Sequence, residues 1–312
     1  MVSRGDLQKL PLPYKSIIMK KNRLIPLLLL LSMGCGRFGN KETDAKKDIR
    51  VVCISKHLTE MMFALGKGHD IVACDLTSTY PDSAKLLPTV GYHRALNPEG
   101  IISMKPDLVI HSNDIGPANV IPQIEKVGLK IQTFGAANTY DSAKIVLMEL
   151  ARYFGAEAKA DSIINKMDAD MQKVELMQKL VKDTPKVMII HYGQANNNFF
   201  VMSGRRGAAD KMIAYAGGKS AIYDAKGARQ LSAEAIAAAN PDIIIATNFG
   251  YDKMGGTIDG FKTVPGVALT NAAKNGKIYR FEEHDLVYFG PRSGENILKL
   301  MNLIHPQLHV QE

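Results

Sequence analysis

The sequence predicts an α/β protein of two Rossmann-like lobes with central parallel sheets, joined by one long bridging helix, with a ligand cleft between the lobes. Three observations support this prediction: short apolar strands alternate with amphipathic helices, a long helical stretch interrupts the alternation, and the pattern then restarts. Near-continuous apolar strands in β-α-β order are typical of a parallel sheet that is covered on both faces.

The first half of the chain contains four predicted strands that helices connect. Each strand is a short apolar run bounded by a glycine, a proline or a charged residue. The strands are expected at 50–55, 70–75, 106–112 and 130–135. The helices between them are expected at 58–68, 99–105 and 120–128. Together these elements form the predicted N-terminal lobe, residues 50–140.

Two cysteines fall within these strands. Cys53 lies in the run RVVCIS and Cys74 in DIVACD. A cysteine in such a run is most often a small buried core residue. A disulfide between neighbouring strands is the alternative that the sequence leaves open.

A helical region is expected at 141–183. Apolar residues recur there at spacings of three and four, and Gly155 divides the region into two helices. The second helix, 157–180, would be about 35 Å long at a rise of 1.5 Å per residue. That length suits a rigid bridge between two lobes.

The C-terminal lobe, expected at 184–312, repeats the pattern of the first. Its predicted strands span 186–190 and 241–247, and its predicted helices span 208–218 and 232–240. Shifted by 135 residues, RALNPEGIISMKPDLVI (94–110) lies without a gap on RQLSAEAIAAANPDIII (229–245). Identical residues occupy the pairs Arg94/Arg229, Leu96/Leu231, Glu99/Glu234, Ile101/Ile236, Pro106/Pro241, Asp107/Asp242 and Ile110/Ile245.

The repeat predicts where a ligand would bind. Two similar lobes joined by one helix leave a cleft between them. Ligands of open α/β sheets bind beyond the carboxyl ends of the strands. We therefore expect Arg94 and Arg229 to face each other across the cleft.

The N-terminal residues are typical of an export signal. MKKNRLIPLLLLLSMGCG, which starts at Met19, has a basic segment, a short apolar run and small residues before Cys35. We expect a signal segment at 1–34 with its true start at Met19, lipidation of Cys35, and a flexible polar tether at 35–49. A plain secretory signal that happens to contain Cys35 is the alternative.

The net charge does not point to nucleic acid. The whole chain carries +8, and it carries +3 once residues 1–34 are left out. Most of the basic excess therefore belongs to the predicted signal segment, and we expect no nucleic-acid partner.

The segment 77–110, TSTYPDSAKLLPTVGYHRALNPEGIISMKPDLVI, resembles the signature region of haem-binding substrate-binding proteins of bacterial ABC importers. These belong to a two-lobed, helix-linked class that also binds ferric siderophores and cobalamin. The likeness extends over about 50–307, and its most specific part is the VGYHR core. It implies a periplasmic carrier that captures ferric haem and delivers it to a permease dimer. We expect the carrier to be a monomer and, from the predicted lipidation of Cys35, to be anchored to a membrane.

The resemblance implies a role for individual residues. It makes Tyr92 the axial ligand of the haem iron, and Arg94 and Arg229 the partners of the haem propionates. It also implies a contact from His191, near the end of the first strand of the second lobe. His93 stands where the family usually has methionine. Because side chains alternate along an extended segment, we expect His93 to point away from Tyr92 into solvent.

The resemblance also gives Glu99 and Glu234 a role, as the glutamates that dock each lobe onto arginines of the permease. Both would also stabilise a helix start through the macrodipole.

The chemistry of these residue types agrees with haem. Tyrosine is an established haem ligand, and Fe³⁺ and a nearby guanidinium both favour its phenolate form. Arginine stays charged and pairs with a carboxylate through two parallel hydrogen bonds. The chain has no tryptophan, so other aromatic residues must form the apolar walls. The expected wall residues are Phe199, Phe200, Phe249, Tyr251, Tyr288 and Phe289.

Other functions remain as alternatives. The same fold could carry a ferric siderophore or cobalamin. Direct Zn²⁺ or Mn²⁺ binding would need about three histidines and a carboxylate converging on one ion. The remaining histidines are scattered and suggest no site: His57, His111, His284, His305 and His309. An enzyme is not expected, because the chain has no GxGxxG after its first strand, no P-loop and no GxSxG.

Overall fold

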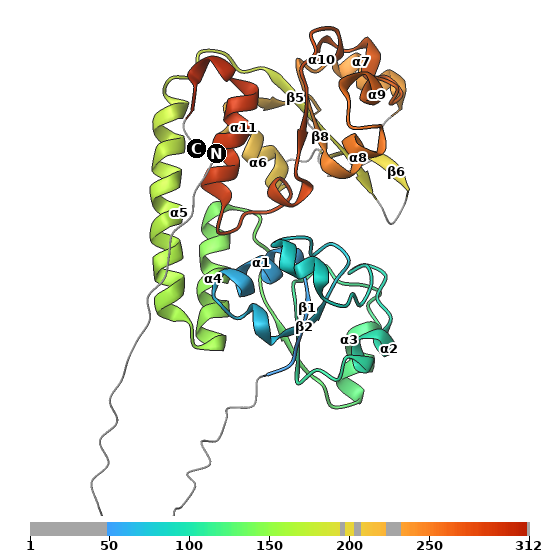
Figure 1. The fold of residues 1–312 in the computed structure, drawn as a ribbon, viewed down its shortest axis with the longest axis vertical. Helices are drawn as coiled ribbons and strands as arrows, with labels where there is room; N and C mark the ends of the chain where they lie inside the picture. Colours follow the sequence, from blue (N-terminus) through green and yellow to red (C-terminus); the bar gives the residue numbers. More distant parts are fainter. Residues whose placement is uncertain (1–48, 194–196, 203–206, 223–231, 311–312) are drawn as a thin grey trace, which may run out of the picture. The chain divides into compact units, whose positions relative to one another are not determined.

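The computed structural model describes residues 49–193, 197–202, 207–222 and 232–310. The predicted signal segment, Cys35, the tether up to residue 48 and Arg229 lie outside the described residues. Within the described part, two sheets with covering helices form two lobes (Figure 1). The predicted two-lobed α/β fold is confirmed, whereas the exact boundaries of the lobes stay a prediction.

The first lobe contains a four-stranded sheet with the order β2-β1-β3-β4, in which every pair of neighbours is parallel. All four predicted strands are present. They are β1 (Val51–Ile54), β2 (Ile71–Cys74), β3 (Leu108–His111) and β4 (Lys130–Thr133). The helical segments of this lobe are α1 (Lys56–Ala64), η1 (Gly68–Asp70), η2 (Asp82–Leu86), α2 (Pro98–Ser103) and α3 (Val120–Lys126).

The second lobe contains a five-stranded sheet with the order β6-β5-β8-β9, and β7 pairs with β5. Its strands are β5 (Lys186–Gly193), β6 (Asn198–Met202), β7 (Lys219–Ser220), β8 (Ile243–Thr247) and β9 (Ile278–Phe281). The sheet is mostly parallel, as predicted, and the pairing of β6, a strand that the sequence analysis did not name, with β5 is antiparallel. The segment between β5 and β6 has too few residues for the crossover connection that joins two parallel strands.

Helices cover the second sheet. They are α6 (Ala208–Tyr215), α7 (Ala233–Ala239), α8 (Asn248–Lys253), α9 (Ile258–Lys262), η3 (Val267–Leu269), α10 (Asn271–Lys274), η4 (Glu283–Asp285), α11 (Ser293–Ile304) and η5 (Pro306–Leu308). The two helices predicted near 208–218 and 232–240 are present as α6 and α7.

Two long helices connect the lobes. Helix α4 (Tyr140–Phe154) begins with a capping box between Thr139 and Ser142, and it ends at Gly155, whose φ of 64° favours glycine. Helix α5 (Glu157–Gln178) has 22 residues, about 33 Å at 1.5 Å per residue. Figure 1 shows α5 running beside α4 and on to α11, so it is the predicted bridging helix.

The buried faces of the sheets form three hydrophobic clusters, one of which the lobes share. On β1, Val51 and Cys53 point into the shared cluster, and the alternate residues point into a cluster of the first lobe. On β5, Val187 and Ile189 point into the same shared cluster, and the alternate residues point into a cluster of the second lobe. Because protein cores are close-packed, a core common to both lobes limits how far one lobe can turn against the other.

The repeat in the sequence corresponds to a repeat in hydrogen bonding. Asp107 Oδ2 accepts from the backbone N–H of Arg50, which precedes β1, at 3.0 Å. Asp242 Oδ2, 135 residues later, accepts from the N–H of Lys186, which starts β5, at 2.9 Å. Each aspartate thus fixes the entry of the neighbouring strand, which explains the identity at these positions.

The two strand cysteines are free and buried, and they are partners in the β1-β2 register. The predicted core role is confirmed. Burial raises the pKa of both thiols, so they stay protonated.

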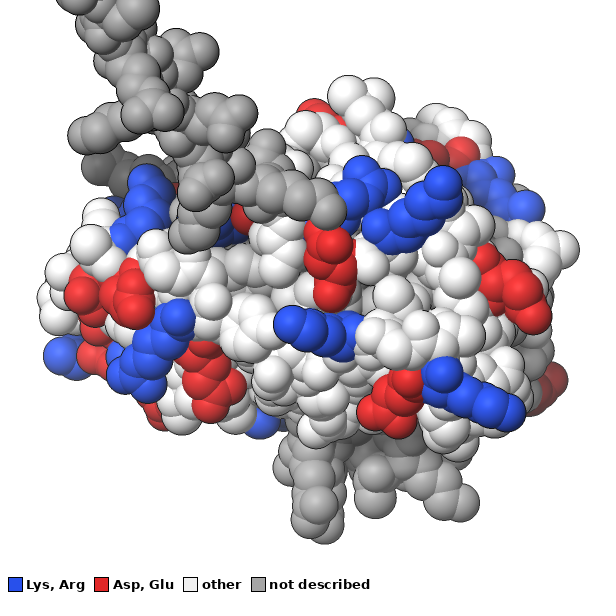
Figure 2. Space-filling model, turned by 90° about the horizontal axis from the view of Figure 1, so that it is seen from below, with Lys and Arg blue, Asp and Glu red and all other residues white. Residues whose placement is uncertain are grey.

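No helix of the described residues is long and apolar enough to span a membrane. On the face of the protein drawn in Figure 2, acidic and basic side chains are interspersed.

Candidate ligand-binding site

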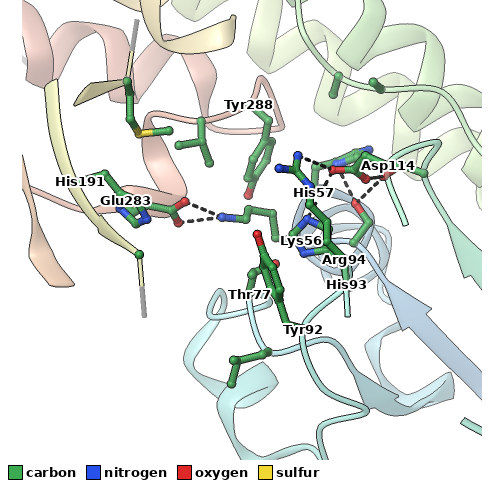
Figure 3. Close-up of a pocket in the computed structure, with 18 of the residues that line it drawn as sticks. Lys56, His57, Thr77, Tyr92, His93, Arg94, Asp114, His191, Glu283 and Tyr288 are labelled. Carbon is green, nitrogen blue, oxygen red and sulfur yellow. Dashed lines mark hydrogen bonds and ion pairs between the residues drawn. The ribbon is translucent and has the colours of Figure 1, made fainter. Parts of the chain in front are cut away.

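A cavity of about 650 Å³ lies between the two lobes. The residues around it mostly follow the carboxyl ends of strands in both sheets, as the strand rule predicts. Tyr92, Arg94 and His191 all line this cavity (Figure 3). The structure therefore brings together three of the four predicted haem-contacting residues.

The loop that carries Tyr92 is tied to the edge of the first sheet. Thr89 bridges Cys74 at the end of β2, and the N–H of Leu76 donates to the carbonyl of Gly91 at 2.8 Å. Gly91 has a φ of 98°, a region that side chains other than hydrogen disfavour. The glycine turns the chain so that the half-buried Tyr92 ring enters the cavity.

His93 is not exposed, contrary to the prediction. Its side chain is 13% exposed, and its ring lies edge-on to the Tyr92 ring with 4.6 Å between centroids. Nδ1 lies 3.3 Å from Asp75 Oδ2 and Nε2 lies 3.4 Å from Asp114 Oδ2, both at ion-pair distance. The alternation rule failed because the chain turns here, where the N–H of Ala95 donates to the carbonyl of Tyr92.

His93 and its two carboxylates form a charged support behind Tyr92. Burial of the ring opposes protonation, but the contacts with Asp114 and Asp75 outweigh it and hold the pKa of His93 above its usual value. The same contact with His93 holds the pKa of Asp114 well below its usual range. His93 is thus a supporting residue for the Tyr92 loop.

Arg94 lies at the exposed edge of the cavity. Its side chain is 62% exposed, and Nη2 lies 3.4 Å from Asp114 Oδ2. A contact this long and exposed leaves the guanidinium able to turn towards an anionic ligand.

His191 faces the cavity from β5 of the second lobe. Its Nδ1 lies 3.1 Å from Thr247 Oγ1, so Nε2 is the ring nitrogen that would bind a metal ion. Burial lowers the pKa of His191; the nearby Glu283 carboxylate opposes this shift and Lys56 adds to it. A neutral imidazole has the lone pair that iron coordination requires.

An ion pair inside the cavity was missed by the sequence analysis. Lys56 Nζ lies 2.6 Å from Glu283 Oε1 and 2.7 Å from Oε2, and both side chains line the cavity. Lys56 follows β1, an inner strand of the first sheet, and Glu283 follows β9, an edge strand of the second. Lys56 directly follows a predicted strand, but no strand was predicted before Glu283, and the pairing of the two residues across 227 positions was not predicted either.

The aromatic walls are partly as predicted. Phe200, Phe249 and Tyr288 line the cavity. Phe289 is fully buried in the shared core instead. Phe199 and Tyr251 pack in the separate hydrophobic cluster of the second lobe. Phe199, Tyr251 and Phe289 were therefore wrongly assigned to the walls of the cavity.

The scattered histidines include one that the prediction misjudged. His57 lines the cavity, where its Nδ1 lies 2.8 Å from Ser55 Oγ. Among the described residues, no group of three or more His, Cys, Asp or Glu side chains is placed to hold a metal ion.

Glu99 and Glu234 occupy equivalent places in the two lobes. Each is the second residue of a short helix, α2 or α7, and each is exposed. The side chains of Asn97 and Ser232 cap these helices by accepting a backbone N–H. Figure 1 shows both helices on the side of the molecule away from α5.

Two similar lobes, a bridging helix and an inter-lobe cavity define a two-lobed ligand carrier. The chain belongs to the periplasmic binding protein family, whose pattern it matches over residues 51–284. It is therefore a substrate-binding protein of the kind that serves ABC transporters.

Two solved structures are similar over nearly their whole length. The periplasmic heme-binding protein RhuT from Roseiflexus sp. RS-1 is 29% identical with a TM-score of 0.76, over 84% of this chain and 99% of that one. The periplasmic heme-binding protein BhuT in complex with two hemes is 30% identical with a TM-score of 0.74, over 83% of this chain and 99% of that one.

Two curated relatives are also similar. The uncharacterized ABC transporter substrate-binding lipoprotein YvrC of Bacillus subtilis strain 168 is 28% identical over 271 residues, 86% of this chain and 83% of that protein. The vitamin B12-binding protein of Vibrio vulnificus strain CMCP6 is 38% identical over 82 residues, 26% of this chain and 30% of that protein.

Proposed function

We propose that this protein captures ferric haem in the periplasm and delivers it to the permease of an ABC importer. One observation carries the proposal: Tyr92 from the first lobe and His191 from the second line one cavity, with Arg94 beside Tyr92. Tyrosine and histidine are both established ligands of haem iron. RhuT and BhuT, which are described as heme-binding, support the same cargo.

Each residue has a distinct task in this proposal. The Tyr92 phenolate binds Fe³⁺, and Arg94 turns from Asp114 to a haem propionate. His191 offers Nε2 to iron from the other lobe. Arg229 supplies the second guanidinium of the repeat. The apolar rings of Phe200 and Phe249 cover the macrocycle.

The proposal includes the route to the membrane. Lipidation of Cys35 anchors the chain beside its transporter, and the flexible polar tether allows the lobes to reach the permease. The exposed carboxylates of Glu99 and Glu234 then contact arginines of the permease, one from each lobe. The YvrC name, which includes the word lipoprotein, supports the anchor.

Cobalamin is the second candidate cargo, because a vitamin B12-binding protein matches part of this chain. An absorption titration of the purified protein with hemin, cyanocobalamin and a ferric siderophore separates the candidates. The proposal expects a shifted and saturable Soret band with hemin, at a lower Kd than for either competitor. Tighter binding of cyanocobalamin or of the siderophore would overturn it.

A further inference from the structure

The Lys56–Glu283 ion pair crosses the cavity in which we place the ligand. The Lys56 side chain is 15% exposed and the Glu283 side chain is 9% exposed. In the view of Figure 3, Lys56 reaches towards Glu283 between the rings of Tyr92 and Tyr288. The pair thus joins the lobes in the interior of the cavity, whereas Arg94 lies at its exposed edge.

The Glu283 carboxylate of the pair is held in its charged form. Burial opposes ionisation of Glu283, but the charge of Lys56 and its hydrogen bond outweigh it and hold the pKa of Glu283 below its usual value. Lys56 therefore already binds a carboxylate, with one ammonium group on both oxygens. That carboxylate comes from the protein itself.

A ligand in the cavity must compete with this pair. Tyr92 and His191 line the same space from opposite lobes, so a planar ligand between them occupies the region that the pair crosses. Removing one member of a buried ion pair leaves the other uncompensated, which is strongly destabilising. A ligand that parts the pair therefore binds well only if it supplies a new anion to Lys56.

We propose that Lys56 is a ligand-carboxylate site that Glu283 occupies until a ligand acid group replaces it. The inference rests on the proposed haem function and deepens it. The long lysine chain has rotatable donors and can turn from one carboxylate to another. Glu283 lines the same cavity, so its carboxylate still faces the cavity when Lys56 turns away. The exchange selects for ligands that carry carboxylates and against neutral ligands of the same shape.

The test compares hemin with its dimethyl ester, which has the same iron and ring but no carboxylates. Kd is measured for both by absorption titration, and the readout is the ratio of the ester Kd to the hemin Kd. In Lys56→Met we expect this ratio to fall about tenfold, because one charge-assisted contact is lost from hemin alone. In Glu283→Gln we expect hemin to bind more tightly than to the wild type, because Lys56 has no internal competitor.

Two further variants act as controls. Lys56→Arg retains a cation and should retain the ratio, which separates the loss of a charge from a loss of folding. Lys144→Met removes a lysine that pairs with Asp168 at 2.8 Å outside the cavity, and it should leave the ratio unchanged.

The outcomes separate this inference from the proposed function. If hemin binds to the wild type but Lys56→Met leaves the ratio unchanged, or Glu283→Gln weakens hemin binding, the pair is a fixed bridge and the inference is wrong. If hemin does not bind to the wild type at all, the proposed function fails and the inference fails with it.

Discussion

The buried Glu60 of the first lobe forms an ion pair with the partly buried Arg292 of the second, in which Arg292 Nε lies 2.8 Å from Glu60 Oε1. The other carboxylate oxygen accepts from Tyr288 Oη at 2.6 Å and lies 2.9 Å from His284 Nε2. Burial opposes ionisation, but His284, Arg292 and Tyr288 outweigh it and hold the pKa of Glu60 below its usual value. One carboxylate from α1 thus binds three side chains of the other lobe.

Replacing Glu60 with alanine should lower the free energy of unfolding by about 3–5 kcal/mol, because the buried Tyr288 hydroxyl and His284 lose their acceptor and Arg292 keeps only Asp285. Urea unfolding monitored by circular dichroism measures the change. The control is Glu125→Ala at an exposed position of α3, where a change within about 0.5 kcal/mol is expected. Equal effects of the two substitutions would show that the Glu60 cluster does not join the lobes.

His57 should make the protein less stable in mild acid. Burial lowers the pKa of His57 from 6.5 to about 4. Between these values the unfolded chain holds more protons than the folded one, so a falling pH favours unfolding. From pH 7 to pH 5 the contribution of His57 to the free energy of unfolding should fall by about 2 kcal/mol.

The variant His57→Gln isolates this effect, because glutamine does not titrate. His93 acts in the opposite direction: its raised pKa gives stability that is present at low pH and lost as the pH rises through its folded-state pKa. That contribution is common to both proteins and cancels in the comparison. The same loss of stability in wild type and variant from pH 7 to pH 5 would contradict the assignment.

Gly91 should control the placement of Tyr92. Alanine at this positive φ costs about 1–2 kcal/mol in backbone strain, and relief of that strain would move the neighbouring tyrosine. We expect Gly91→Ala to lower both stability and hemin affinity. Gly100→Ala in α2 is the matched control, because its φ is ordinary and a Cβ would meet only the Val90 carbonyl oxygen at 3.9 Å. An unchanged hemin Kd in Gly91→Ala would argue against a fixed tyrosine.

The paired glutamates should act in delivery and not in binding. The double variant Glu99→Ala, Glu234→Ala should bind hemin like the wild type, because both side chains are exposed and neither lines the cavity. Growth of the native host on hemin as its iron source should slow markedly. Normal growth of that strain would show that Glu99 and Glu234 are not needed for docking to the permease.

The sequence predicted the strands and the lobes well because the signals were local. Apolar runs such as VVCI and LVIH are buried on both faces, and the gapless repeat marked two aspartates that hold equivalent strand entries. The position of Tyr92 in the cavity also followed from a local motif. These features depend on residues that are close together in the chain.

The errors arose where tertiary contacts decide the outcome. His93 turned inward because Asp75 and Asp114 come from the ends of two strands, and an alternation rule cannot include them. Lys56 and Glu283 are 227 residues apart, and nothing in either local sequence indicates the other. The sequence analysis named no strand at β6, which pairs antiparallel with β5.

The most direct test of the central claim is whether binding depends on iron through Tyr92. Hemin and metal-free protoporphyrin IX share the same ring and carboxylates, and only hemin can use the phenolate. We predict that Tyr92→Phe weakens hemin binding at least about tenfold and changes the Soret band, with no change in the Kd for protoporphyrin IX. An unchanged hemin spectrum and Kd in Tyr92→Phe would contradict the account.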